Sequence, residues 1–320
     1  MKRVVSVSLG SSERDSSAQV ELLGQEFEIS RVGTDGDKAK FAQMVSELDG
    51  KVDAIGLGGT DRYLWTGKRR YTVRDADRLA RCAKSTPVVD GSGVKHTLER
   101  KTIEYLQANG IVDFASSKVL ITSAVDRFGM AQTIAGLSKD VVYGDLMFAC
   151  NVPIPIRSYS MINMVGGIFL PLVCRLPFEW IYPTGSKQKQ SVPKYVKYYA
   201  WADVIAGDFH FIKRTMPALE SGALEGKVII TNTLTADDVM ALAQRKARLL
   251  VTATPDYNGR RFGTNVLEGV LVTLLGKDPD ELTSQDYDEL LARLDWKPTI
   301  TDLATHPAAK QQPTKAEEAK

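Results

Sequence analysis

Short apolar runs alternate with stretches of helical spacing along the first part of the chain. Three runs have the length of buried strands: Val4–Leu9, Glu26–Val32 and Val52–Leu57. Between them, Lys38–Leu48 repeats its apolar residues every three to four positions, and Val94–Ala108 does the same, so both predict helices. Strands that alternate with helices favour a mostly parallel sheet. We therefore predict an α/β domain over residues 1–112, a candidate substrate domain.

The alternation resumes at Lys118–Asp145. An apolar run at 119–121 is followed by a polar turn, a helix-like stretch at 128–137 and a second apolar run at 141–143. This is the order of the opening βαβ unit of a dinucleotide-binding domain, whose helix N-terminus faces the pyrophosphate. The acid about 20 residues further on binds the ribose hydroxyls, and Asp145 has that spacing. We predict a second Rossmann-like domain over residues 113–276.

The turn of this unit carries only part of the glycine fingerprint. G-x-G-x-x-G would need three glycines, and the turn supplies only Gly129. Asp126 would repel a phosphate unless Arg127 offset its charge. Two interpretations stay open, a dinucleotide site and a doubly wound sheet without a dinucleotide. The candidate cofactor-binding residues are Asp126, Arg127, Gly129, Met130 and Asp145, with Asn232 and Thr254 at two later strand ends.

Three strand ends of the first domain carry small or polar residues: Ser8–Ser12, Gly58–Arg62 and Asp90–Thr97. Ligands of open parallel sheets bind beyond the carboxyl ends of the strands. The last of these turns places three small residues at a helix N-terminus and Lys95 in the first helical turn, where free N–H groups and an ammonium could hold a carboxylate or phosphate. An ordinary glycine-rich turn is the alternative. The candidate substrate contacts are Ser11, Ser12, Thr60 and Ser92.

The alternation stops between residues 151 and 201. Pro153 and Pro155 exclude a regular helix at 151–156, because proline lacks the N–H donor and fixes φ. We interpret 151–201 as an aromatic and proline-rich insertion in the second domain, and we expect it to pack on the sheet or on a second subunit, which would give a homodimer. We predict that residues 277–307 form a C-terminal helical extension. The polar tail, residues 308–320, is expected to be disordered.

Composition narrows the classes of function. The chain has 320 residues, and 41 basic against 39 acidic residues give no electrostatic case for a nucleic-acid partner. Three scattered cysteines suggest reduced thiols and a cytoplasmic protein, and neither the cysteines nor the three histidines have metal-ligand spacing. The apolar stretch 161–174 is too short for a membrane span, which needs about 20 residues. It could still lie on a membrane surface or line a partner interface.

Several motifs together resemble a known bacterial family. They are Gly144–Phe148, Leu176–Gly185, Ala206–His210, Ile230–Thr233 and Phe262–Asn265. The chain is similar in these motifs to the family labelled quinate 5-dehydrogenase, over nearly its whole length up to about Leu275. The resemblance implies NAD- or NADP-dependent oxidation of a ring hydroxyl of quinate or shikimate, a small cyclic polyol acid.

The resemblance also implies a catalytic pair. Well-studied quinate and shikimate dehydrogenases place a lysine and an aspartate around the reacting hydroxyl. Lys95 can take the lysine role by position, with Asp61 or Asp90 as its acidic partner. A lysine acts as the base for a hydroxyl when its pocket lowers its pKa.

The sequence leaves three functions to compare. The first is an NAD(P)-dependent oxidoreductase whose substrate lies between the two domains. The second is a non-catalytic small-molecule-binding or regulatory protein on a dehydrogenase-like fold, which the incomplete glycine turn favours. The third and weaker one is a transferase that binds a phosphate ligand at the turns of Gly10, Gly58 and Gly91.

Overall fold

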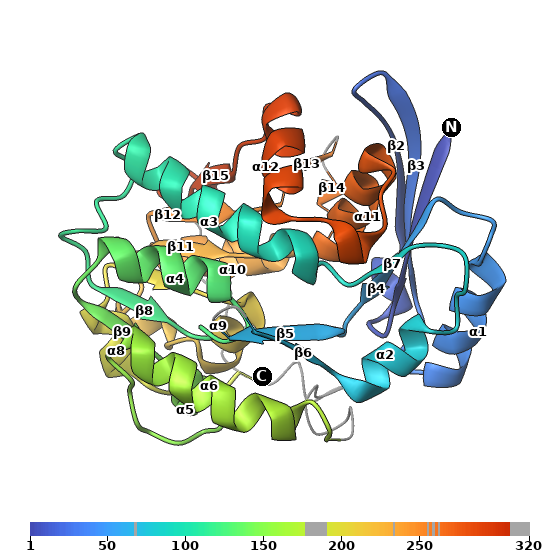
Figure 1. Ribbon diagram of the computed structural model, residues 1–320. Coiled ribbons are helices and arrows are strands. Elements are labelled where there is room, and N and C mark those ends of the chain that lie inside the picture. The colour runs from blue at the N-terminus through green and yellow to red at the C-terminus, as the bar shows by residue number, and fades with distance from the viewer. Residues whose placement is uncertain are drawn as a thin grey trace.

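The computed structural model describes residues 1–66, 69–176, 191–232, 234–254, 256–257, 260–261 and 263–307. Its described part contains two mainly parallel sheets with helices packed around them (Figure 1). The α/β class with parallel sheets is therefore confirmed. The Leu176–Gly185 motif lies almost wholly outside the described residues, and the tail at 308–320 lies entirely outside them.

The first sheet has the order β2-β3-β1-β4-β7. Its strands are β1 (Lys2–Ser8), β2 (Ser16–Leu22), β3 (Gln25–Gly33), β4 (Ala54–Gly58) and β7 (Val88–Val89). Only β2 is antiparallel, and it was not predicted, because its half-exposed alternation gives a weaker signal than the continuous apolar runs of the buried strands. The helices of this half are α1 (Lys38–Leu48), α2 (Arg74–Ala80) and α3 (Ser92–Ala108), with a 3-10 turn at Ser12–Arg14. A hairpin of β5 (Tyr63–Thr66) and β6 (Arg69–Thr72) projects from it.

The second sheet has the order β15-β12-β11-β10-β8-β9. Its parallel strands are β8 (Val119–Ile121), β9 (Val141–Tyr143), β10 (Val204–Ala206), β11 (Val228–Thr231) and β12 (Leu249–Thr252). β15 (Thr299–Asp302) adds an antiparallel edge. The helices that follow β8 along the chain are α4 (Phe128–Leu137), α5 (Asp145–Phe148), α6 (Tyr159–Val173), α8 (Val196–Trp201), α9 (Phe209–Thr215), α10 (Ala236–Gln244), α11 (Thr264–Leu275) and α12 (Ser284–Arg293). Short elements are the hairpin β13 (Asp256–Tyr257) and β14 (Arg260–Arg261) and the 3-10 turns Leu219–Ser221 and Pro279–Glu281.

The predicted βαβ unit is present. β8 and β9 pair in parallel, with Val119 opposite Val141, and α4 connects them. All three residues of each strand are buried, as expected of a parallel sheet that is covered on both faces.

The predicted boundary at residue 276 does not follow the packing. α11 comes after the second sheet in the chain, yet it packs on β1 and β4 of the first sheet. A Cβ built on Gly269 would lie 2.8 Å from Cγ1 of Val4, so the helix lies almost directly on the strands. The apolar run of α11 predicted a helix but could not say which sheet it covers. The segment 277–307 is also not purely helical, because it ends in β15.

The insertion at 151–201 contains the 15-residue helix α6, which begins at the side-chain cap of Ser158. Pro171 lies near its C-terminal end and does not stop it. No helix in the described part of the chain is long and apolar enough to cross a membrane.

Gly129 serves helix packing. A Cβ at this position would lie 2.5 Å from the carbonyl oxygen of His96 and 2.7 Å from its Cα, so α4 can approach α3 only with a glycine here. Gly129, predicted as a cofactor-binding residue, thus has a packing role between α4 and α3.

We expect Gly129→Ala to lower the free energy of unfolding by about 1–3 kcal/mol, since the backbone of α3 would have to move. The matched control is Gly136→Ala on the same helix, where an added Cβ meets nothing within 4 Å. That change should raise stability by up to about 1 kcal/mol. Urea unfolding of the two variants measures both effects, and similar values for the two would contradict this role of Gly129.

Candidate functional site

The carboxyl ends of both sheets meet around a group of buried charges. In the second sheet the chain runs from β8 to β9 on one side and then to β10 on the other, so the strand order reverses between β8 and β10. Such a reversal is the usual ligand site of an open α/β sheet. Asp126 follows β8 and Asp208 follows β10, and Arg127 joins the two carboxylates.

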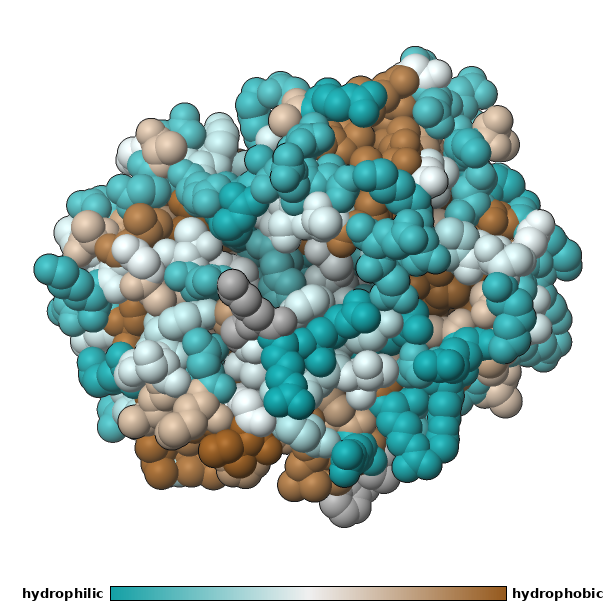
Figure 2. Space-filling view, in the orientation of Figure 1, coloured by the Kyte–Doolittle hydropathy of each residue, from teal (hydrophilic) through white to brown (hydrophobic). Residues whose placement is uncertain are grey.

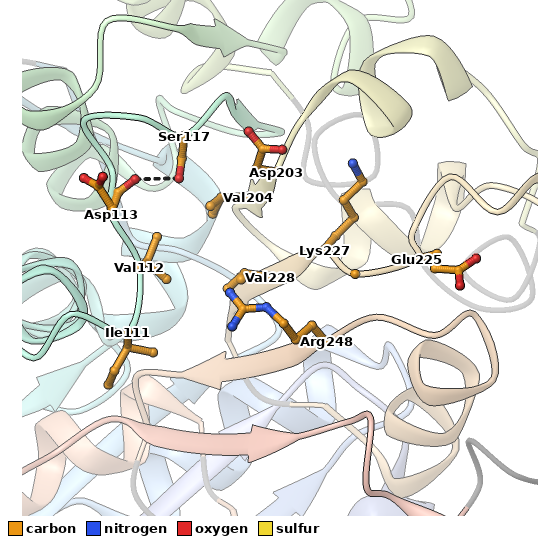
Figure 3. A pocket seen from close by; sticks show the side chains of 11 residues that line it. Ile111, Val112, Asp113, Ser117, Asp203, Val204, Glu225, Lys227, Val228 and Arg248 are labelled. Atoms are coloured by element: carbon orange, nitrogen blue, oxygen red, sulfur yellow. Dashed lines mark hydrogen bonds between the residues drawn. The ribbon is translucent and has the colours of Figure 1, made fainter.

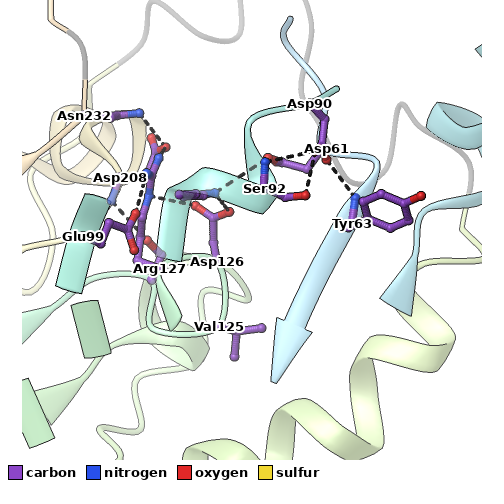
Figure 4. A network of polar contacts seen from close by, with 12 residues as sticks. Asp61, Tyr63, Asp90, Ser92, Glu99, Val125, Asp126, Arg127, Asp208 and Asn232 are labelled. Carbon is purple, nitrogen blue, oxygen red and sulfur yellow. Dashed lines mark hydrogen bonds and ion pairs between the residues drawn. The ribbon is translucent and has the colours of Figure 1, made fainter. Parts of the chain in front are cut away.

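The charges form one connected network, which we call the ion cluster: Asp61, Lys95, Glu99, Asp126, Arg127, Asp208 and Asn232 (Figure 4). Lys95 Nζ lies 2.6 Å from Asp126 Oδ1 and 3.7 Å from Asp61 Oδ1. Lys95 therefore links Asp61, which follows β4 of the first sheet, to Asp126, which follows β8 of the second sheet. Arg127 NH1 donates to Glu99 Oε1 at 2.8 Å, and Asn232 Nδ2 donates to Asp208 Oδ2 at 2.8 Å.

Lys95 is a fixed ammonium. Its side chain is only 10% exposed, and burial together with Arg127 lowers its pKa. The carboxylates of Asp126 and Asp61 raise it more, so the pKa of Lys95 lies above its ordinary value. A general base needs a lowered pKa, so this environment does not favour the base role of Lys95, which stays a prediction.

Carboxyl groups outnumber cations two to one in the ion cluster, with Asp61, Glu99, Asp126 and Asp208 around two cations. Burial raises the pKa of Glu99, whereas that of Asp126 is lowered because Lys95 and Arg127 outweigh its burial. An additional anion in contact with this cluster would be repelled at short range. Hydroxyl groups, which donate as well as accept, suit it better.

A small cavity of about 10 Å³ opens beside the cluster, about the space of one water molecule. It is lined in part by Lys95, Arg127, Met130, Asn232 and Thr254. The structure thus brings four predicted cofactor residues together with the predicted catalytic lysine. A nicotinamide ring would need the two sheets to separate further.

The predicted partner Asp90 does not contact Lys95. Its carboxylate accepts from the N–H groups of Arg62 at 2.5 Å and Tyr63 at 3.0 Å, and from both the N–H and the hydroxyl of Ser92. Asp90 therefore holds the turns together, and Ser92 is used in the same way. These contacts give no support to the catalytic role of Asp90 or the ligand role of Ser92, and both stay predictions.

The other predicted substrate contacts divide in two. Thr60 is buried beside Asp61, and its Oγ1 has no hydrogen-bond partner among the described residues. Ser11 accepts from Glu13 N–H, and Ser12 N–H donates to Asp35 at 2.8 Å. Their contacts lie within the β1 and β3 loops, and none joins them to the ion cluster.

Asp145 occupies the place where the turn after β8 could bind an anion. Its carboxylate accepts from the N–H groups of Ala124 at 3.1 Å and Val125 at 2.9 Å. Burial raises the pKa of Asp145 to about 6, against the effect of these two bonds. In this conformation the acid predicted to bind ribose instead satisfies the turn itself.

The N-terminus of α4 is satisfied by side chains of α3. Gly129 N–H donates to Nδ1 of His96 at 3.2 Å, and Met130 N–H approaches Oε2 of Glu99 at 3.4 Å. Burial, with a contribution from Lys95, lowers the pKa of His96 to about 4, so the ring is neutral and can accept this bond. The donors that a pyrophosphate would use are thus already paired.

The glycine turn before α3 is filled in the same way. Gly91 N–H donates to Oε2 of Glu268 at 2.6 Å, and Tyr287 donates its hydroxyl to Oε1 at 3.1 Å. Burial, with a contribution from Asp90, raises the pKa of Glu268 to about 8. These contacts remove the main structural argument for a phosphate site at this turn.

Sequence reasoning missed Glu99, Asp208, His96 and Glu268. Glu99 could have been found, because it follows Lys95 by four residues and shares its helix face. Asp208 begins α9 directly after a strand end, a position that the sequence also showed. No local signal marks Glu268, which reaches the turn from α11 at the other end of the chain.

A larger hollow of about 320 Å³ lies at the opposite end of the second sheet. It is lined by residues that precede or begin β8, β10, β11 and β12, including Val112, Asp203, Lys227 and Arg248 (Figure 3). Because ligands of open α/β sheets bind at the carboxyl ends, we place the candidate site at the ion cluster.

The fold and the cluster together define an α/β protein with a buried charged junction between two parallel sheets. The chain belongs to the family described as Domain of unknown function (DUF8754), which matches residues 93–303. A second family, Domain of unknown function (DUF8753), matches residues 3–90. No curated protein matches the sequence.

Several solved structures are weakly similar. One is a sugar ABC transport system substrate-binding protein from Bordetella parapertussis 12822, with 11% identity, 97% of this chain and 92% of that chain covered, and a TM-score of 0.36. Another is an NAD-dependent malic enzyme from Thermotoga maritima, with 12% identity, 92% and 84% covered, and a TM-score of 0.35. Likenesses at this level carry no argument about function.

Glu268 should make stability depend on pH. Its pKa of about 8 in the folded chain lies above the ordinary 4.5, so its contribution is fully present below about pH 4.5 and is lost as the pH rises through 8. In Glu268→Gln the decline in unfolding free energy between pH 5 and 8 should be smaller by up to roughly 1.4 kcal/mol per pH unit. Urea unfolding at several pH values measures this slope.

The control is Glu289→Gln, which changes an exposed glutamate on α12 and should leave the slope unchanged. Equal slopes for Glu268→Gln and the unchanged protein would show that Glu268 does not titrate in this range.

Proposed function

We propose that this chain binds a small polyhydroxylated molecule between its two sheets, in contact with Asp61, Lys95 and Asp126. The observation that carries the proposal is the position of Lys95, which joins carboxylates from the two sheets where both sheets end. Such a ligand would bridge the two halves of the molecule, and the halves would have to separate to admit it, because the cavity beside Lys95 has only about 10 Å³.

The chemistry of the cluster suits hydroxyl groups. A lysine ammonium donates up to three hydrogen bonds and carboxylates only accept, so neighbouring hydroxyls of a polyol can satisfy both. The hydroxyl of Thr60, buried beside Asp61, would add a further contact. Because carboxyl groups are in excess in the ion cluster, the uncharged hydroxyl-bearing side of the ligand would contact it. An acid such as quinate or shikimate would point its own carboxylate away from the cluster.

Binding of such a ligand should depend on Lys95. We expect a polyol that raises the melting temperature of the unchanged chain to bind at least about tenfold more weakly to Lys95→Met, because a hydrogen bond to a charged group is lost. Thermal-shift titrations with myo-inositol, sorbitol, quinate and shikimate measure this.

Lys101→Met is the matched control, because Lys101 lies on the same helix and pairs with Asp288 instead, 3.5 Å away. It should keep the ligand-induced shift. Equal shifts in both lysine variants, or no shift with any polyol, would refute the proposed site.

A second candidate is NAD(P)-dependent oxidation of a hydroxyl of the same ligand. The parallel β8–α4–β9 unit, which ends at Asp145, supports it, and both sheets reverse their strand order as Rossmann-like units do. Lys95 would then donate a hydrogen bond to the hydroxyl oxygen, the carboxylate of Asp61 would accept the hydroxyl proton, and the nicotinamide would accept the hydride. The dinucleotide would have to displace the carboxylate of Asp145 from the turn.

Asp145→Ala separates the two candidates. If the acid binds ribose, titration with NAD(H) and NADP(H) by calorimetry should show saturable binding to the unchanged chain and its loss in Asp145→Ala. If neither cofactor binds while a polyol still does, the oxidoreductase candidate fails and polyol binding stands. An exposed control, Asp295→Ala, should not affect either ligand.

A further inference from the structure

Exposed apolar side chains gather on α6 and on the segment that precedes it. Eleven large apolar residues are exposed in the described part of the chain, and seven of them fall between residues 152 and 172. We call these seven the α6 surface: Val152, Ile154, Met161, Met164, Ile168, Phe169 and Leu172. Figure 2 shows hydrophobic residues along the edge of the molecule where Figure 1 places α6. A concentration of this kind marks a contact with a partner or a membrane.

The geometry of α6 explains the exposure. Ile162, Gly166 and Leu170 recur every four residues and are buried against the protein. Gly166 allows close packing, since a Cβ there would lie 3.0 Å from Oγ1 of Thr66. The opposite face carries Ile168 at 64% exposure and Leu172 at 62%. The helix therefore lies along the surface with an apolar outer face.

The charged residues that flank α6 in the sequence are basic. No acidic residue occurs from 157 to 176, and exposed arginines stand at both ends, Arg157 and Arg175. The backbone N–H of Arg74 donates to the carbonyl of Cys174 beside the C-terminal end of α6. Lys194 Nζ donates to Asn151 Oδ1 in the segment that precedes the helix. An apolar face with basic residues at its ends complements a surface that has an apolar interior beneath a layer of anionic groups.

We propose that the α6 surface docks on an anionic lipid surface, with α6 in the plane of the interface. In-plane helices bury an apolar face at the boundary of headgroups and acyl chains, and basic residues attract the anionic lipids. Phe169 and the aliphatic residues would enter the boundary, and Arg157 and Arg175 would contact headgroups.

The same features disfavour a second copy as the occupant. A helix of 15 residues is about 22 Å long and about 10 Å wide, a footprint of roughly 220 Å², whereas a stable interface buries about 800 Å² per partner. An antiparallel pair of α6 helices would also bring Arg157 close to Arg175 of the other copy. Like charges at both ends oppose that pairing.

Vesicle flotation tests the proposal with the full chain. We expect binding to vesicles of phosphatidylcholine with one-third phosphatidylglycerol, at least tenfold weaker binding to phosphatidylcholine alone, and weaker binding at higher salt. Ile168→Gln with Leu172→Gln should reduce binding at least tenfold, and each of Arg157→Gln and Arg175→Gln about fivefold on anionic vesicles alone.

Met240→Gln is the control, because it changes an exposed apolar residue on α10, away from the α6 surface, and should bind normally. Melting temperatures show whether each variant is folded. Absence of flotation with anionic vesicles overturns the proposal. So does light scattering that shows a dimer which Ile168→Gln converts to a monomer, since a second copy would then cover the α6 surface.

Discussion

The junction of the two sheets depends on the guanidinium of Arg127. It contacts carboxylates from three different elements, Glu99 of α3, Asp126 of the turn after β8 and Asp208 at the start of α9. Arg127 is only 6% exposed, and removing one partner of a buried ion pair typically costs about 3–5 kcal/mol because the remaining charges lose compensation. Lys95 extends the same network to Asp61 of the first half. The position of one half against the other thus depends on these buried charges as well as on the packing of α3 against α4 and of α11 on the first sheet.

A related constraint explains why motifs that suggested anion binding are satisfied internally. N–H groups at strand-to-helix turns need acceptors when they are buried. A ligand can supply them, but here Asp145, Glu99 and Glu268 do so. All three acids have a raised pKa because their burial outweighs the contacts that would lower it. A turn whose N–H groups bind an acid of the same chain therefore has the same glycines and small residues as a turn that binds phosphate, and the sequence alone does not distinguish the two.

Local sequence patterns predicted the elements well where burial was continuous. The apolar runs of β1, β4 and β8 and the helical spacing of α1, α3 and α4 are found as expected. The patterns also placed Lys95, Asp61 and Asp126 at strand or helix ends that converge. They could not show that Glu268 reaches the turn of Gly91 from 177 residues away. Nor could they show that burial among acids would hold Lys95 charged, since a pKa depends on neighbours that only the fold brings together.

α11 follows the second sheet in the chain but packs on the first sheet. This arrangement constrains whether the two segments can be separated in evolution and how the two sheets can move relative to each other. The family match that includes α11 covers residues 93–303, whereas the strands it packs on fall in the match at 3–90. A gene fragment that encoded only the first segment would leave the apolar face of β1 and β4 uncovered, so the segments have reason to stay together in evolution. The chain also crosses between the halves three times, before β8, after β12 and before β15. Three covalent crossings limit how far the two halves can separate and leave a hinge-like rotation as the simplest opening.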